Sequence, residues 1–230
     1  MKKLIFLVFL AAAGGYWLLL TKPAFYYGDS FEYKSFTLRA RGPVPAGTEP
    51  VLDRALDKIS RSEFFTPEAK FTIYLTAGPG ELRFFAPFIA GAYSRVNPVS
   101  GGIFLAPGDF SQDKIRTATG EQEYRFLNQA IAGAAAREMV RRRLEALTYI
   151  FRKDWEITGY AARIAGGSDQ FKPEDFCKSA PEGSALRDYQ YAQAVGVIMD
   201  IEHQSFSELL NRNHSYESLE TQLKRRYCNQ

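Results

Sequence analysis

The stretch AAAREMVRRRLEALTYIFRKDWEITGYAAR, residues 134–163, decides the predicted fold of this chain. It predicts two helices separated by a short gap, the first carrying R-E-x-x-R and the second W-E-I-T-G-Y-A. At 100° per residue, Arg137 and Arg141 lie on one face of the first helix, together with the small residues Ala130 and Gly133. Small residues on that face let the backbone of another element come close.

The charged side chains of the first helix need partners. A half-buried guanidinium requires a carboxylate or several carbonyl groups, and the candidates in the sequence are Glu138, Asp154 and Glu156. Arg142 and Arg143 point away from the face that carries the small residues, and we expect them to be solvated. The alternative is an ordinary core helix whose arginines reach solvent at its rim.

Composition favours one domain with a sizeable core and gives no support for a nucleic-acid partner. The chain has 230 residues, of which 46% are hydrophobic and 14% aromatic. The net charge is only +3, and Glu138, Glu145 and Asp154 interrupt the basic run from Arg137 to Lys153. We therefore expect one domain, with or without a membrane segment, and no binding of nucleic acid.

The N-terminal segment predicts a membrane anchor. Lys2 and Lys3 precede an uncharged run from residue 4 to residue 20, and a helix of that length extends about 26 Å, just sufficient for a bilayer core. The segment Ala11–Gly15 within this run resembles a signal-peptidase site. A protein secreted after signal cleavage is therefore the alternative to an anchored one.

The N-terminal segment and the two cysteines also predict in which cellular compartment the protein lies. Leading lysines favour an N-terminus that stays inside, so we expect a single-pass protein of a bacterial-type inner membrane with a periplasmic domain. Cys177 and Cys228 are the only cysteines and are expected to form a disulfide, with two unpaired thiols as the alternative. The chain is thus divided into an anchor or signal segment (1–22), a juxtamembrane linker (23–33) and an extracytoplasmic domain (34–230).

Hydrophobic periodicity predicts an α+β fold, with a small mixed sheet and a helix first and a mostly helical C-terminal half after it. Strands are expected at 34–41, 70–76, 92–96 and 102–106, and helices at 50–60, 120–151, 154–166, 184–203, 205–212 and 215–227. The strand at 102–106 is expected at an edge of the sheet, where it would accept an extended peptide.

The order of these elements resembles a gluzincin, the thermolysin-like group of zinc metallopeptidases. In that family H-E-x-x-H provides two zinc ligands and a glutamate that polarises the attacking water, and a second helix provides a third ligand in a setting such as W-x-x-E-G-x-A. The segment REMVR matches the first motif in position, with Arg137 and Arg141 in place of the histidines and Glu138 in the general-base position. The segment WEITGYA matches the second motif, with Thr158 in the ligand position.

The resemblance implies a zincin-like fold over roughly residues 50–225, and it likens residues 92–106 to the edge hairpin that lines the family's substrate cleft. The family's chemistry is not expected here. Arginine is cationic at every usable pH and threonine is a poor ligand for zinc. His203 and His214 each lack a second histidine four residues away. We therefore expect no metal, no cofactor and no metallopeptidase activity.

The leading hypothesis is a membrane-anchored, catalytically inactive pseudopeptidase that binds a protein or peptide at the cell envelope. Its cleft is expected to include Glu156, Tyr160, Tyr191 and Tyr93. The two alternatives are a hydrolase that uses the same cleft without zinc and a purely structural envelope protein.

The arginines in the motif have two predicted roles. In one, Arg137 and Arg141 fill the volume of the metal ion and pair with Glu138 and Glu156. In the other, their guanidinium groups bind an incoming carboxylate, such as the C-terminus of a peptide. In the hydrolase alternative, Glu138 would serve as a general base.

Overall fold

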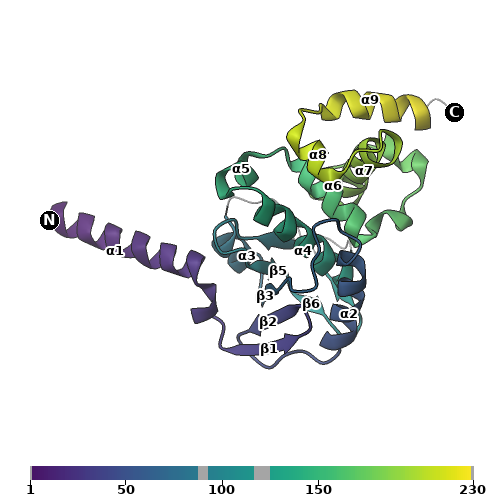
Figure 1. Cartoon of the computed structure of the whole chain (residues 1–230). Helices are drawn as coiled ribbons and strands as arrows, with labels where there is room; N and C mark the ends of the chain where they lie inside the picture. The colour runs from purple at the N-terminus through teal and green to yellow at the C-terminus, as the bar shows by residue number, and fades with distance from the viewer. Residues whose placement is uncertain (1, 88–92, 117–124, 229–230) are drawn as a thin grey trace.

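The computed structural model describes residues 2–87, 93–116 and 125–228 and has an α+β architecture (Figure 1). A five-stranded mixed sheet lies in the N-terminal half, and the C-terminal half is mostly helical. One large hydrophobic core joins the sheet to the helices. The α+β class expected from the sequence is confirmed.

The main sheet has the strand order β1-β2-β3-β5-β4. Its strands are β1 (Asp29–Tyr33), β2 (Phe36–Ala40), β3 (Phe71–Leu75), β4 (Ser94–Val96) and β5 (Ile103–Leu105). β2, β3 and β5 are parallel neighbours, whereas β1 and β4 are antiparallel edge strands. The edge expected at 102–106 is therefore wrong, because β5 is paired on both sides and β4 forms the edge.

A second, smaller sheet follows the first along the chain. It consists of β6 (Gly108–Asp109), β7 (Lys114–Ile115) and β8 (Arg125–Phe126), with antiparallel pairing throughout. Strand β8 leads directly into the central helix α4. The small sheet thereby fixes where that helix begins.

Strand β1 lies within the segment expected to be a juxtamembrane linker. A two-residue turn at Lys34 and Ser35 joins it to β2, and Lys34 has a φ of 51°. Turns of this kind are recognised in sequences from Asn-Gly or Asp-Gly pairs, and Lys-Ser gives no such signal. The sheet therefore begins at Asp29, five residues before the strand that the pattern predicts at 34–41.

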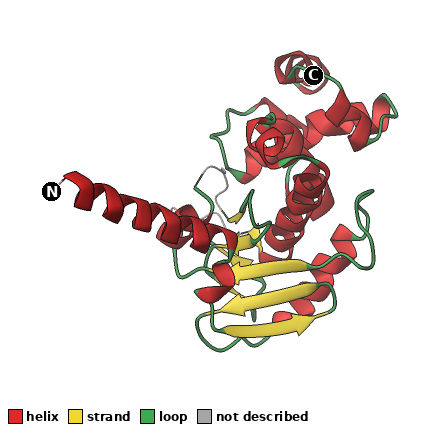
Figure 2. Cartoon of the chain, turned by 60° about the vertical axis from the view of Figure 1, so that its left-hand side comes forward, coloured by secondary structure: helices red, strands yellow, loops and turns green. Residues whose placement is uncertain are grey.

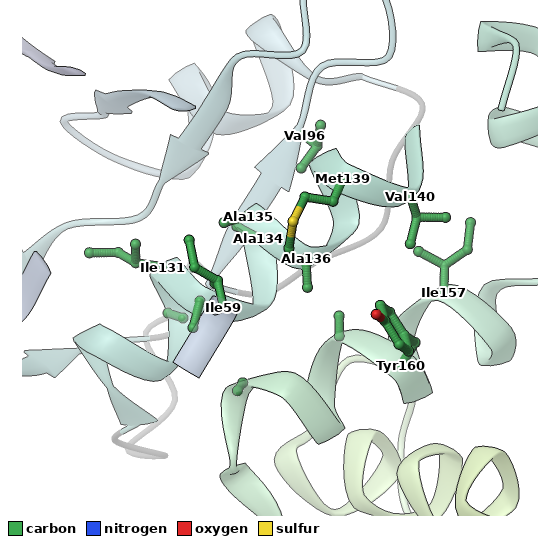
Figure 3. Packing of buried hydrophobic residues seen from close by; sticks show 14 of the residues in the cluster. Ile59, Val96, Ile131, Ala134, Ala135, Ala136, Met139, Val140, Ile157 and Tyr160 are labelled. Carbon is green, nitrogen blue, oxygen red and sulfur yellow. The ribbon is translucent and has the colours of Figure 1, made fainter. Parts of the chain in front are cut away.

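Helix α4 (Leu127–Arg143) is the centre of the core. Its residues Ala134, Ala135 and Ala136 are fully buried. Figure 3 shows this helix between Ile59 of α2 (Thr48–Ile59) and Tyr160 of α6 (Asp154–Ala165). Because alanine side chains are short, neighbouring elements pack closely on several sides of α4.

The single helix expected over 120–151 is wrong. Residues 120–124 lie outside the described residues, and α4 ends where Leu144 and Glu145 adopt extended backbone angles, with ψ of 150° and 151°. A separate helix, α5 (Ala146–Phe151), then begins. No glycine or proline marks this break in the sequence, so the helical pattern runs through it unchanged.

Gly159 allows α6 and α7 (Ala185–Gly196) to touch through their backbones. A β-carbon at this position would lie 2.4 Å from the carbonyl oxygen of Tyr191 and 2.7 Å from a methyl group of Val195. Real β-carbons do not approach a backbone atom so closely. The glycine of the segment WEITGYA therefore has a packing role in this protein.

Replacing Gly159 by alanine should lower the free energy of unfolding by roughly 1–3 kcal/mol, because the helices must move apart to admit the methyl group. Urea denaturation followed by circular dichroism measures the loss. Gly80→Ala is the matched control, since a β-carbon there meets nothing within 4 Å. Equal stability of the two variants would contradict the close contact between α6 and α7.

The C-terminal helices follow the predicted boundaries closely. After α7 come a π-helical turn (Val197–Ile201), α8 (Phe206–Asn211) and α9 (Tyr216–Tyr227), and the remaining short elements are α3 (Pro79–Phe85), η1 (Pro23–Phe25), η2 (Gly167–Gln170) and η3 (Pro173–Cys177). A disulfide joins Cys177 to Cys228 across 51 residues, which confirms the predicted pairing. It links the end of η3 to the end of α9.

Helix α1 (Lys2–Thr21) projects away from the rest of the protein (Figures 1 and 2). Most of its described apolar side chains are exposed, among them Phe6 (60%), Phe9 (67%) and Trp17 (59%). Among the described residues, no helix combines the length and the apolar character needed to cross a membrane.

The end of α1 is attached to the body of the protein by side-chain hydrogen bonds. The buried Asn97, which directly follows β4, donates from its side-chain nitrogen to the carbonyls of Leu20 (3.1 Å) and Phe85 (2.7 Å). Its side-chain oxygen accepts two backbone N–H groups of the turn between β4 and β5. The hydroxyl of Tyr16 donates to the carbonyl of Phe84 at 2.9 Å.

Candidate functional site

A cavity of about 260 Å³ opens between α4, α6, α7 and the edge strand β4. Four of the residues singled out in the sequence line it: Tyr93, Arg137, Thr158 and Tyr191. They come from different elements, yet the fold brings them together around one space. This cavity, called the central cavity below, is the candidate functional site.

Arg137 lies on the side of α4 where Ala130 and Gly133 leave room, and all three residues line the central cavity. Its guanidinium donates to the Thr158 hydroxyl at 3.5 Å, a long hydrogen bond. That hydroxyl in turn donates to Oδ1 of Asp154 at 3.2 Å. Two of the three positions that the resemblance assigns to metal ligands are therefore in contact with each other.

Arg141 and Glu138 do not line the central cavity. The Arg141 guanidinium donates two bonds to the Glu138 carboxylate, at 2.5 Å from Nε and 2.9 Å from Nη2. Arg142 adds a third bond at 2.8 Å. The expected pairing of Glu138 with Arg141 is present. Arg142 is exposed, as expected, with its side chain 40% accessible, and it also donates to the buried carboxylate.

The turn between β4 and β5 packs on this ion-pair cluster. Gly101 there has a φ of 72°, and a β-carbon on it would lie 2.5 Å from Oε1 of Glu138. The Glu138 side chain is only 2% exposed. Both carboxylate oxygens accept guanidinium N–H groups, so Glu138 is a structural anion and is not placed to take a proton from a molecule in the central cavity.

Glu156 and Tyr160 lie elsewhere, which corrects the prediction that they line the cleft. Glu156 is fully buried and accepts a hydrogen bond from Arg152 rather than from the motif arginines. Burial raises the pKa of Glu156, and the Arg152 charge opposes that shift. Tyr160 stacks on Phe206 with ring centroids 4.0 Å apart. These residues stay in the core because the face of α6 that bears them turns away from the cavity.

Tyr93 and Tyr191 form part of the cavity wall. The Arg125 guanidinium lies 4.7 Å from the centre of the Tyr93 ring, a distance typical of a cation–π contact. The Tyr191 hydroxyl donates to Oε1 of Glu182 at 2.9 Å. Burial and this bond raise the pKa of Tyr191, so its phenol stays protonated around neutral pH and can donate only one hydrogen bond.

The charged residues of the central cavity were mostly missed by sequence reasoning. Asp154 was considered only as a partner for an arginine, and Arg125, Glu182 and Asp188 were not considered at all. Arg125 pairs with Asp188 at 2.8 Å. Burial raises the pKa of Asp154, while the charge of Arg137 lowers it. No sequence spacing relates these residues, because they lie on separate elements.

No metal-binding cluster is present among residues 2–87, 93–116 and 125–228, if a cluster requires three or more histidine, cysteine or acidic side chains. No protein-family model matches the chain, and neither curated proteins nor solved structures give a match. The interpretation of the central cavity therefore depends on its own residues. Those residues include three arginines, three carboxylates and two tyrosines, drawn from β4 and the residue before it, β8, α4, α6, α7 and the segment before α7.

Proposed function

We propose that this protein is a membrane-anchored, catalytically inactive, gluzincin-like protein that binds an extended peptide or protein segment in the central cavity. One observation carries the proposal. Arg137 and Thr158, which occupy two of the ligand positions of the motif, line the same cavity as Tyr93 and Ser94 at the edge of the sheet. The resemblance would assign this place to the substrate cleft, and under the proposal Arg137 takes the position of the metal ion.

Strand β4, at the edge of the sheet, has backbone groups that do not pair with β5. The N–H of Asn97 donates to Gly102, and the N–H of Ala106 donates to Tyr93, both at 2.8 Å. Because bonding positions alternate along an antiparallel pair, the backbone groups of Ser94 and Val96 point away from β5. Ser94 is only 5% exposed and Val96 0%, so pairing of an extended peptide with this edge requires these residues to become accessible first.

The membrane part of the proposal is supported by helix α1. Its exposed apolar side chains, from Ile5 to Leu10 and at Trp17 and Leu18, would be costly to leave in water. The disulfide between Cys177 and Cys228 is typical of proteins outside the cytoplasm. We therefore propose a periplasmic body anchored to a bacterial-type inner membrane.

One experiment on the full chain in detergent micelles distinguishes peptide binding from peptide cleavage. A library of N-acetylated tetrapeptides is tested for binding by fluorescence anisotropy and for cleavage by mass spectrometry. We expect binding without cleavage, no bound zinc by elemental analysis and no effect of a chelator on the melting temperature. Cleavage of any peptide, or zinc that a chelator removes with a loss of stability, would refute the inactive assignment.

Membrane attachment has its own test. Cells expressing the full chain are fractionated, and the membranes are washed with alkaline carbonate. We expect the protein to stay in the membrane pellet until detergent is added, and a protease added outside spheroplasts to digest its body. Release by carbonate, or protection of the body from that protease, would contradict the proposed anchoring.

A further inference from the structure

The central cavity contains a guanidinium with unused donors. Arg137 is half-buried, and its one described hydrogen bond is the long one to Thr158. Among the residues that the structure describes, no carboxylate oxygen lies within 4.0 Å of its nitrogens. Asp154 is connected to it through the Thr158 hydroxyl, and most of the five N–H groups of the guanidinium have no described acceptor and can bind an anion.

The other described arginines at this cavity already have partners. Arg125 is paired with Asp188 and lies against the Tyr93 ring. Arg95 donates to the carbonyl of Ala86 at 3.1 Å. An anion that enters the cavity would therefore meet N–H groups of Arg137 that its one described hydrogen bond leaves unused.

The charges around Arg137 limit the kind of anion. The described lining contains three arginines and three carboxylates, which cancel. A dianion such as phosphate would face the negative charges of Asp154, Glu182 and Asp188 with only one guanidinium to receive it. A single carboxylate matches that guanidinium in charge and can accept two parallel N–H bonds from it.

The volume of the cavity is suited to the end of a bound peptide rather than to a large ligand. Its volume of about 260 Å³ lies just below the roughly 300–1,000 Å³ of pockets that enclose whole small ligands. It therefore suits one or two residues rather than a large cofactor. Ser94 of β4 and Arg137 of α4 both line the cavity, so a chain end that enters it comes close to Arg137.

We infer that the central cavity recognises a free C-terminal carboxylate, with Arg137 as the residue that binds it. This inference rests on the proposed peptide-binding function and adds the group that the site selects. Thr158 is a positioning residue, because its hydroxyl accepts from Arg137 and connects it to Asp154. The chain end lies between α4 and α6, where the resemblance would place a metal ion.

The test compares two forms of one peptide library. N-acetylated tetrapeptides are made once as free acids and once as C-terminal carboxamides, and their dissociation constants for the full chain in micelles are measured by anisotropy competition. We expect the free acids to bind at least about tenfold more tightly than the carboxamides. Arg137→Gln should abolish this preference and Arg137→Lys should retain part of it.

Arg143→Gln is the matched control, because Arg143 is exposed on the same helix and does not line the cavity. It should keep the full preference for free acids, and circular dichroism confirms that each variant is folded. Equal binding of the two peptide forms to the unmodified protein would overturn the carboxylate site and leave the peptide-binding function standing. A preference that survives Arg137→Gln would also overturn it. Absence of binding by either form would refute the proposed function together with this inference.

Discussion

Glu138→Ala is expected to lower the free energy of unfolding by about 3 kcal/mol, the lower end of the cost of breaking a buried ion pair. Glu138 is 2% exposed and receives hydrogen bonds from two arginines. Its removal leaves the Arg141 guanidinium, whose side chain is only 18% exposed, without its carboxylate. For a chain of this length, such a loss corresponds to a fall in melting temperature of roughly 10 °C.

Calorimetry of the full chain in detergent micelles measures this effect. Glu145→Ala is the control, because Glu145 is exposed just beyond the end of α4. Glu138→Gln should fall between the control and Glu138→Ala, since the amide keeps one acceptor oxygen and the same volume. If Glu138→Ala melts with the control, the cluster of Glu138, Arg141 and Arg142 contributes nothing to stability.

Loss of the disulfide should have an effect of similar size. In the chain-entropy account, a cross-link that closes about 50 residues contributes about 4 kcal/mol, and typical measured values are about 2–4 kcal/mol. The Cys177→Ser, Cys228→Ser double variant should therefore unfold at a clearly lower urea concentration than the oxidised protein. Dithiothreitol should bring the unmodified protein to the same midpoint, and it should not change the double variant.

The loosened region should be the C-terminal helix. Helix α9 contacts η3 and α7, and its Leu219 and Leu223 are buried in the core. Hydrogen exchange measured by mass spectrometry should speed up over residues 216–227 in the double variant, while α4 stays protected. Unchanged exchange there would mean that packing alone holds α9 in place.

Long, regular elements were predictable because their periodicity reports burial directly. In α2, periodicity places Val51, Leu52, Ala55, Leu56 and Ile59 on one face, and all of them are fully buried except Leu56, which is partly buried. Strand β1 and the break after α4 were not predictable in this way. The turn at Lys34 has no characteristic residue pair, and the extended residues Leu144 and Glu145 are as compatible with a helix as their neighbours are.

The candidate site was predictable only in part. The four-residue spacing suggested a shared face for Arg137 and Arg141, but Arg141 turns to Glu138 and only Arg137 reaches the cavity. Side-chain torsions decide between these outcomes, and a helical wheel does not include them. Tertiary folding brings Arg125, Glu182 and Asp188 to the site, and their proximity cannot be inferred from a single sequence.

The buried side chain of Asn97 connects three parts of the molecule. One side chain holds the last turn of α1, the end of α3 and the turn that follows β4. The end of α1 therefore cannot shift relative to the β4–β5 turn without breaking one of these bonds or the one from Tyr16 to Phe84.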